Sequence, residues 1–481
     1  MAGEMERHLP PEILHMIFSN LCIHCYNPLP SLMPDLNTSL CRVDKSTLAH
    51  LCRASKTFRD IAQPVLFHYF VLNTTAYQFR VRRLRAQLLK FLRVLCVRPD
   101  LAQAVRALGL RPGKFWKDVY PIDHITWHAM GHIDLLGFQD YSRDKPASIS
   151  LSLASRLLLR VCPNLEYLRV VVPFYGGLNW CDVKPMPSMR VLELVSRPQM
   201  QFRLIDLDEA FRCLPNLTSL NLSGVCLHCK HHWDPDIGVP HLCDHRVWDI
   251  LPSSLKKITA DSVYIYRLAH LFDNCPQLED LEMHIGYSNH DWMLTPPLGA
   301  LEERRHTLRR LVVNIVNWRD YIAFPSPPEM PRPDNCYYNV NMAFQKMTNL
   351  EFLGVDQPII ECEAHRAGFV DLLSGALPES LRTLHIGYVT RKRTLVSQLH
   401  DLRDKKLQGR FKYLTEVRIG LCSPWEHLEK VLPELQEMLA AVGTDLVMVT
   451  KTAGRSSLCT ISLPLSRLTE YTDSMPRSGY L

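Results

Sequence analysis

The chain has 481 residues, of which 47% are hydrophobic and 22% are charged. This balance is typical of a folded protein and excludes an intrinsically disordered one. Only 20 residues are glycine, and neither a G-x-G-x-x-G motif after a strand nor a G-x-x-x-x-G-K-[ST] motif is present, so a nucleotide-binding enzyme that cradles phosphate is not expected. The net charge of +6 is too small to indicate a nucleic-acid-binding protein by itself.

The compartment follows from what the sequence lacks. The first residues, Met1–Glu12, are charged and have no apolar core, so no secretory signal is expected. No run of about 18 apolar residues is present, so no membrane-spanning helix is expected. Without a secretory route, the 16 cysteines are expected to be reduced thiols, either buried or bound to metal. These features predict a protein of the cytoplasm, the nucleus or both.

Three short amphipathic helices are predicted near the start of the chain. The segment Leu9–Leu21 contains two prolines that suit a helix start, followed by apolar residues at helical spacing. Asp44 or Ser46 can cap a second helix, and Ser55 can cap a third, which Pro64 is expected to end. Three such helices form a core that is marginal alone, so a partner that covers the first helix would stabilise them.

These helices carry a resemblance to a known family. The sequence LPPEIL from Leu9, followed at a distance by LCRASKTFRDIAQPVLF from Leu51, resembles an F-box, in particular those of filamentous fungi. The match covers roughly 65 residues, and its largest departure from the family is the loop inserted at 23–43. The resemblance implies that the first helix docks on the Skp-type adaptor of a cullin–RING ubiquitin ligase. The adaptor-binding residues that it implies are Leu9, Pro10, Ile13, Leu14 and Ile17. The alternative is that the helices only form an N-terminal cap on the rest of the chain.

A basic helix is predicted within the next segment, 73–100. Between Ala76 and Arg98 there are seven basic residues and no acidic one, and the apolar residues share one face. One interpretation is a patch that binds nucleic acid or an acidic membrane. We favour a packing helix that joins the F-box rigidly to the following domain, because basic residues occupy its whole polar side.

A short phrase, L-x-x-L-x-h with h apolar, recurs nine times between residues 101 and 450. CPNLEYLRVVV from Cys162 and LPNLTSLNLS from Leu214 are two of these copies, and RALGL from Arg106, before the nine, resembles a degenerate copy. The first apolar residue of each copy is called the anchor below. The nine anchors are Leu165, Met189, Leu217, Leu255, Leu278, Leu308, Leu350, Leu381 and Leu414. They lie 23 to 42 residues apart, and most spacings are near the roughly 20–29 residues of a leucine-rich repeat.

The repeats predict a solenoid in which each unit is a strand preceded by a helix. Proline before most anchors stops the preceding helix, so that a strand can begin. The fold class expected is therefore a small three-helix F-box at 1–72, followed by an irregular leucine-rich-repeat solenoid at 101–450 with parallel strands and outer helices. A compact α/β domain would need glycine-rich turns that are missing.

Further segments are assigned from the same pattern. The expected helices are 151–161, 206–214, 263–272, 366–374 and one that ends near Gly443 before a final strand. Insertions are expected near 224–248 and 323–340, and a loose tail is expected at 451–481.

Two groups of cysteine and histidine have spacings that suit a metal. In the insert near 224–248, Cys226 and Cys229 form a C-x-x-C pair, and His241, Cys243 and His245 follow. Two ligand pairs separated by a loop suit tetrahedral zinc, but we favour a polar surface loop with incidental thiols. The weaker group, in the F-box loop, consists of Cys22, His24, Cys25 and Cys41. We assign no metal ligand and no cofactor from the sequence alone.

No catalytic constellation is found. The chain contains neither G-x-S-x-G nor H-E-x-x-H, and a Cys–His pair would have to be chosen arbitrarily among 16 cysteines and 21 histidines. The sequence therefore predicts a non-enzymatic substrate receptor that binds a Skp-type adaptor, and through it a cullin, and holds an unknown target protein on its repeats. The alternatives are a repeat scaffold that binds the adaptor without ubiquitination, and a zinc-pinned nucleic-acid binder. Neither a membrane nor a nucleic-acid partner is expected.

Overall fold

The protein is described by a computed structural model. The described residues are 9–26, 39–71, 81–110, 119–121, 148–150, 157–171, 184–195, 208–223, 251–263, 275–286, 305–316, 344–357, 372–387, 389, 392–421 and 431–450. The chain forms two compact units, Met1–Val225 and Cys226–Leu481, and each is described by itself.

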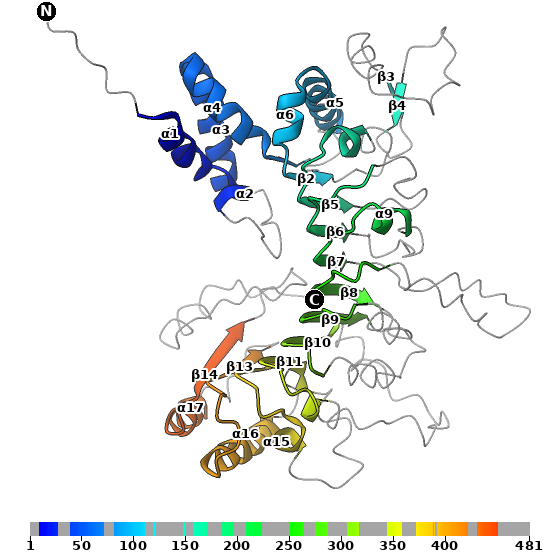
Figure 1. Ribbon diagram of the computed structural model, residues 1–481. Coiled ribbons are helices and arrows are strands. Elements are labelled where there is room, and N and C mark those ends of the chain that lie inside the picture. Colours follow the sequence, from blue (N-terminus) through cyan, green and yellow to red (C-terminus); the bar gives the residue numbers. More distant parts are fainter. Residues whose placement is uncertain are drawn as a thin grey trace, which may run out of the picture. The chain divides into compact units, whose positions relative to one another are not determined.

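The first unit begins with four helices, drawn in blue in Figure 1. They are α1 (Pro11–Ser19), α2 (Ile23–Tyr26), α3 (Ser39–Ala54) and α4 (Lys56–Phe67). Pro10 and Pro11 lie at the start of α1, where a missing N–H removes no helical hydrogen bond. Ser55 caps α4, as predicted, because its hydroxyl accepts a hydrogen bond of 3.0 Å from the Phe58 N–H.

Three details of this region differ from the prediction. Helix α3 begins at Ser39, so Asp44 and Ser46 lie inside it rather than at its start. The inserted loop contains a short helix, α2, that the polar sequence did not indicate. Pro64 lies inside α4 and does not end it. The buried residues Ala62 and Val65 on either side of Pro64 pack in the core, and this packing outweighs the loss of one N–H.

The basic segment forms helix α5 (Val81–Val97), followed by α6 (Pro99–Ala104). Leu88, Leu92 and Leu95 of α5 are buried, which confirms that the apolar face of this helix packs against the protein. Phe91 of α5 stacks on Phe70, with ring centroids 3.8 Å apart. This stack joins α5 to the first strand of the unit.

Five parallel strands belong to the described part of the first unit. They are β1 (Tyr69–Val71), β2 (Ala107–Leu110), β5 (Tyr167–Val171), β6 (Val191–Val195) and β7 (Ser219–Ser223), and they lie side by side in that order. Helix α9 (Asp208–Arg212) precedes β7. An antiparallel pair, β3 (Val119–Pro121) and β4 (Ser148–Ser150), lies outside this order and was not predicted.

The second unit repeats the same plan with seven parallel strands in sequence order. They are β8 (Lys257–Val263), β9 (Asp280–Gly286), β10 (Arg310–Val316), β11 (Phe352–Asp356), β12 (Thr383–Gly387), β13 (Glu416–Leu421) and β14 (Asp445–Thr450). Helices α15 (Leu372–Ala376), α16 (Lys392–Leu407) and α17 (Leu432–Ala440) lie along one side of these strands (Figure 1). Both units are thus built as a solenoid-like α/β fold, as the repeat predicted.

The anchors explain why strands form where they do. All nine anchors are fully buried, and a strand follows each of them within two or three residues. The second leucine of the phrase lies at the same position in successive strands, so these leucines form a continuous buried row. Leu281, Leu311, Leu353 and Leu384 are aligned in this way on neighbouring strands. One strand cannot bury such a face alone, so each repeat depends on its neighbours.

Asparagine side chains tie successive repeats together. In the phrase P-N-L, Asn164 donates a 2.9 Å hydrogen bond to the Gln103 carbonyl, and Asn216 donates one of the same length to the Pro187 carbonyl. In the second unit, Asn349 bonds the carbonyl of His306 in the preceding copy. These bonds satisfy carbonyls at the turns, where no strand partner is available.

The predicted helices are matched unevenly. Helix α9 lies within the expected segment 206–214, α15 overlaps the expected 366–374, and α17 ends before Gly443 as expected. Val263 ends strand β8, while 264–272, the inserts near 224–248 and 323–340, and the tail 451–481 lie outside the described residues. Helix α16 was not predicted, although its buried residues Leu395, Leu399 and Leu402 have helical spacing.

Candidate functional site

Helix α1 has one face in the protein core. Leu14 and Phe18 are buried on this face, and Cys22 continues it beyond the helix. Phe18 contacts Phe58 of α4 edge to face, with ring centroids 5.7 Å apart. Leu48 of α3 and Val65 of α4 belong to the same cluster, so α1 is held firmly on one side.

The other face of α1 presents apolar side chains to solvent. The exposed fractions are 53% for Leu9, 41% for Ile13, 64% for Met16 and 46% for Ile17. Of the seven large hydrophobic residues that are exposed in the described part of the chain, these four lie within nine consecutive positions. We call them the exposed α1 face. Apolar side chains gathered on one exposed face make this surface a candidate for binding a partner.

The exposed α1 face includes three of the five residues that the sequence assigned to adaptor binding. Leu9, Ile13 and Ile17 belong to it, and Pro10 is exposed beside them. Leu14 does not, because it is 8% exposed and packs in the helical core. Met16 was missed, although its spacing of three residues from Ile13 places both on one helical face.

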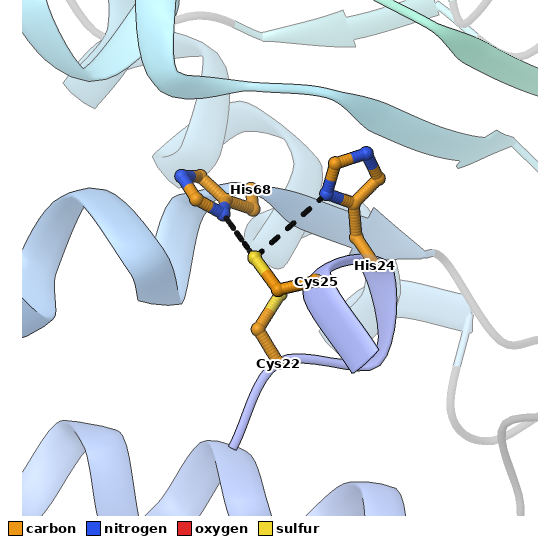
Figure 2. Close-up of side chains that lie close together, drawn as sticks. All are labelled: Cys22, His24, Cys25 and His68. Atoms are coloured by element: carbon orange, nitrogen blue, oxygen red, sulfur yellow. Dashed lines mark hydrogen bonds between the residues drawn. The ribbon is translucent and has the colours of Figure 1, made fainter. Parts of the chain in front are cut away.

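A second feature of the first unit is a cluster of two cysteines and two histidines. Cys22, His24, Cys25 and His68 offer donor atoms that all lie within 4.8 Å of one another. The sulfur of Cys25 lies 3.2 Å from Nδ1 of His68 and 4.0 Å from Nδ1 of His24 (Figure 2). Cys22 lies 4.0 Å from the same nitrogen of His68. We call these four residues the Cys/His cluster.

The local fold explains how the Cys/His cluster forms. Cys22 directly precedes α2, His24 and Cys25 lie within it, and His68 follows the end of α4. The carbonyl of His68 accepts hydrogen bonds of 2.9 and 2.8 Å from the N–H groups of Arg106 and Ala107, which fix it at the start of β2. Nε2 of His24 lies 3.2 Å from a carboxylate oxygen of Glu166, just before β5.

The two thiols of the cluster titrate as a pair. The Cys25 S–H donates a hydrogen bond to Cys22, which lowers the pKa of Cys22, and the ring of His68 lowers it further. The same hydrogen bond and burial raise the pKa of Cys25. The pair therefore loses its first proton, from Cys22, more readily than an ordinary thiol does, whereas Cys25 keeps its proton more strongly.

The other metal candidates from the sequence are not tested by the structure. The side chain of Cys41 and the insert residues Cys226, Cys229, His241, Cys243 and His245 lie outside the described residues. His68 was missed by sequence reasoning because it is separated from Cys25 by 43 residues. No sequence spacing connects it to the C-x-x-C pair.

A charged row crosses the strands of the second unit on the side opposite the buried leucines. Arg310 lies at its centre, 2.8 Å from Asp280 and 2.9 Å from Glu282. Lys257 pairs with Asp280 at 2.9 Å, and His284 contacts Glu282 at 2.9 Å. Because side chains alternate along a strand, residues on either side of each buried leucine form this row.

Burial would raise the pKa of Glu282, but the hydrogen bond from His284 and the charge of Arg310 outweigh it and lower the pKa to about 2. Phe352 of β11 extends the row, because the guanidinium groups of Arg310 and Arg418 lie 5.1 and 5.8 Å from its ring centroid. The row therefore combines charge with an aromatic surface.

His385 of β12 gives the second unit a sensitivity to acid. Burial, followed by the charges of Arg418 and Arg310, lowers its pKa to about 4 against the opposing effect of Glu282 and Glu416. Below pH 6.5 the unfolded chain binds a proton on this imidazole, whereas the folded protein does not until about pH 4. The free energy of unfolding should therefore fall by about 3 kcal/mol from this residue alone between these values.

The measurement is urea unfolding at several pH values with His385→Gln. Between pH 6.5 and 4, wild type should lose stability faster than this variant, which cannot titrate at that position. The exposed residue His306 provides the control, and His306→Gln should follow wild type. Parallel curves for wild type and His385→Gln would contradict a buried neutral imidazole.

No family model matches the chain, and no curated protein matches it. Among the helices that the structure describes, none combines the length and the apolar character needed to cross a membrane.

Proposed function

We propose that the chain is a non-enzymatic substrate receptor of a cullin–RING ubiquitin ligase. In this proposal α1–α4 form an F-box, and the exposed α1 face docks on a Skp-type adaptor. The observation that carries the proposal is the division of α1 into a buried face and an exposed apolar face. A helix that only capped the repeats would bury its apolar residues against them.

The sequence resemblance and the packing support the same partner. The residues LPPEIL that resemble an F-box include Leu9 and Ile13, which are exposed. Leu14 lies behind them and holds α1 on the core, so the docking side chains are presented on a rigid support. Such preorganisation reduces the entropy that binding would otherwise cost.

The second unit supports the other half of the proposal, which is capture of a target. Its charged row presents Lys257, Asp280, Arg310 and Arg418 in partly exposed positions, with Phe352 between the two arginines. A row of both signs with an aromatic centre suits recognition of a protein surface. Ubiquitin transfer then depends on proximity, since bound target lysines stay near the charged conjugating enzyme without chemistry in this chain.

Co-purification of a Skp-type adaptor with the tagged chain tests the proposal. Ile13→Asp combined with Ile17→Asp should weaken adaptor binding by at least about 100-fold, because each charge would be buried in the interface. Val97→Asp, an exposed apolar position on α5, is the matched control and should bind normally. Leu14→Asp is unsuitable because a charge in the helical core would unfold α1.

Failure of the wild-type chain to recover any adaptor would overturn the proposal. A second measurement deletes the chain from cells and follows the levels of the proteins that co-purify with it. If the chain recovers the adaptor and cullin but none of these levels changes, a scaffold that does not lead to ubiquitination would be favoured. The two functions share the exposed α1 face, so only the second measurement separates them.

A further inference from the structure

The Cys/His cluster has the dimensions of a tetrahedral metal site. For zinc bound by two sulfurs at about 2.3 Å and two nitrogens at about 2.0–2.1 Å, donor atoms lie roughly 3.3–3.8 Å apart. Three sulfur–nitrogen pairs of the cluster, at 3.2, 4.0 and 4.0 Å, bracket these edges, and all four donors lie within 4.8 Å of one another. A pair at the 4.8 Å limit would have to close by about 1 Å to reach the expected spacing.

The orientation of the side chains also suits a metal. Both imidazoles turn Nδ1 toward the sulfur of Cys25 (Figure 2). Nε2 of His24 is directed away and lies 3.2 Å from Glu166, and a carboxylate in this place orients a metal-binding histidine and fixes its tautomer. Cys22 is buried and the His24 side chain is 13% exposed, so the cluster is shielded from bulk water.

The donor types identify the metal. Two thiolates and two imidazoles favour zinc over magnesium or calcium, which bind oxygen. Four protein ligands leave no open coordination position, so such a site is structural rather than catalytic. Its ligands come from α2 and the end of α4, and its supporting carboxylate comes from the turn before β5.

We propose that Cys22, His24, Cys25 and His68 bind one zinc ion that fastens the N-terminal helices to the first parallel strands of the same unit. On binding, the proton still held by the thiol pair passes to solvent, and the two thiolates and two neutral imidazoles donate to the metal without any redox change. The ion fixes α2 against His68, whose carbonyl is bonded to the start of β2. This role is independent of the proposed function and can be tested on the chain alone.

Metal analysis of the purified full chain is the test. Cys226→Ser and Cys229→Ser are introduced first, so that the other cysteine-rich segment cannot contribute. This background should contain about one zinc ion per chain. Cys25→Ser and His68→Ala should each lose that ion, whereas Cys52→Ser, a cysteine that packs against the same helical core outside the cluster, should keep it.

Three further measurements apply if Cys25→Ser fails to fold. X-ray absorption at the zinc edge of the background protein should show two sulfur and two nitrogen neighbours. Glu166→Gln, which removes the carboxylate charge beside His24, should weaken zinc binding by about 10- to 100-fold in competition with a chelator. Cys25→His should retain zinc, because imidazole can replace a thiolate.

Three outcomes would overturn the proposal. They are a background protein free of zinc, zinc content unchanged by Cys25→Ser, and a Cys22–Cys25 disulfide found by mass spectrometry in protein purified under reducing conditions. Adaptor binding is not part of the measurement, so failure here leaves the proposed function standing.

Discussion

Leu381→Ala is expected to lower the free energy of unfolding of the second unit by about 3–4 kcal/mol. Leu381 is an anchor, fully buried before β12, and its removal leaves a cavity beneath two neighbouring repeats. The surrounding strands are tied by parallel hydrogen bonds on both sides, so they cannot collapse into the space. Urea unfolding followed by circular dichroism measures the change.

Leu407→Ala is the matched control for this prediction. Leu407 lies at the end of α16 and is 70% exposed, so the same chemical change should cost less than about 0.5 kcal/mol. Equal losses in the two variants would contradict the assignment of the repeated leucine as a structural anchor. A loss confined to Leu381→Ala would support the assignment of Leu381 as a structural anchor. By analogy, the same assignment would then apply to the other eight anchors.

Arg310→Met should destabilise the second unit by about 3 kcal/mol, near the lower end of the range for breaking a buried ion pair. The change leaves Glu282 without its cation, although Lys257 still pairs with Asp280. A larger loss of stability is not expected because the Arg310 side chain is 31% exposed, so water can partly replace its interaction with Glu282. Arg309→Met is the control, since Arg309 is well exposed and lies 3.8 Å from its partner Glu351.

The same variant has a distinctive pH dependence. The pKa of Glu282 is about 2 in the folded protein and 4.5 unperturbed, so its ion pair stabilises the fold above pH 4.5 and this contribution is lost as pH falls toward 2. Without Arg310 the pKa of Glu282 rises. The stability difference between wild type and Arg310→Met should therefore shrink as pH falls below 4.5. A difference that stays constant with pH would show that lost packing, not charge, is responsible.

Much of the solenoid could be predicted from the sequence because its signal is local and repeated. Each phrase places an anchor and a strand within about ten residues, as in Leu165 before β5 and Leu350 before β11. The buried face of α5 could also be predicted, because the spacing of its apolar residues is a local pattern. The antiparallel strands β3 and β4 carry no such phrase and were not found.

The candidate site could be predicted less completely, because burial depends on neighbours that are distant in sequence. Leu14 and Ile13 are adjacent and similar in character, yet only the packing of α3 and α4 decides that Leu14 is inside. In the same way, His68 joins Cys25 only because α4 ends beside α2. Pro64 was expected to break α4, and the buried residues around it kept the helix intact.

The central claim is that the exposed α1 face binds a Skp-type adaptor, and calorimetry with the two purified proteins tests it most directly. The account predicts saturable one-to-one binding by the wild-type chain and by Val97→Asp. It predicts that Ile13→Asp combined with Ile17→Asp weakens this binding by at least about 100-fold while the circular dichroism spectrum stays unchanged. The absence of binding by the wild-type chain, or equal affinity in the folded double variant, would contradict the account.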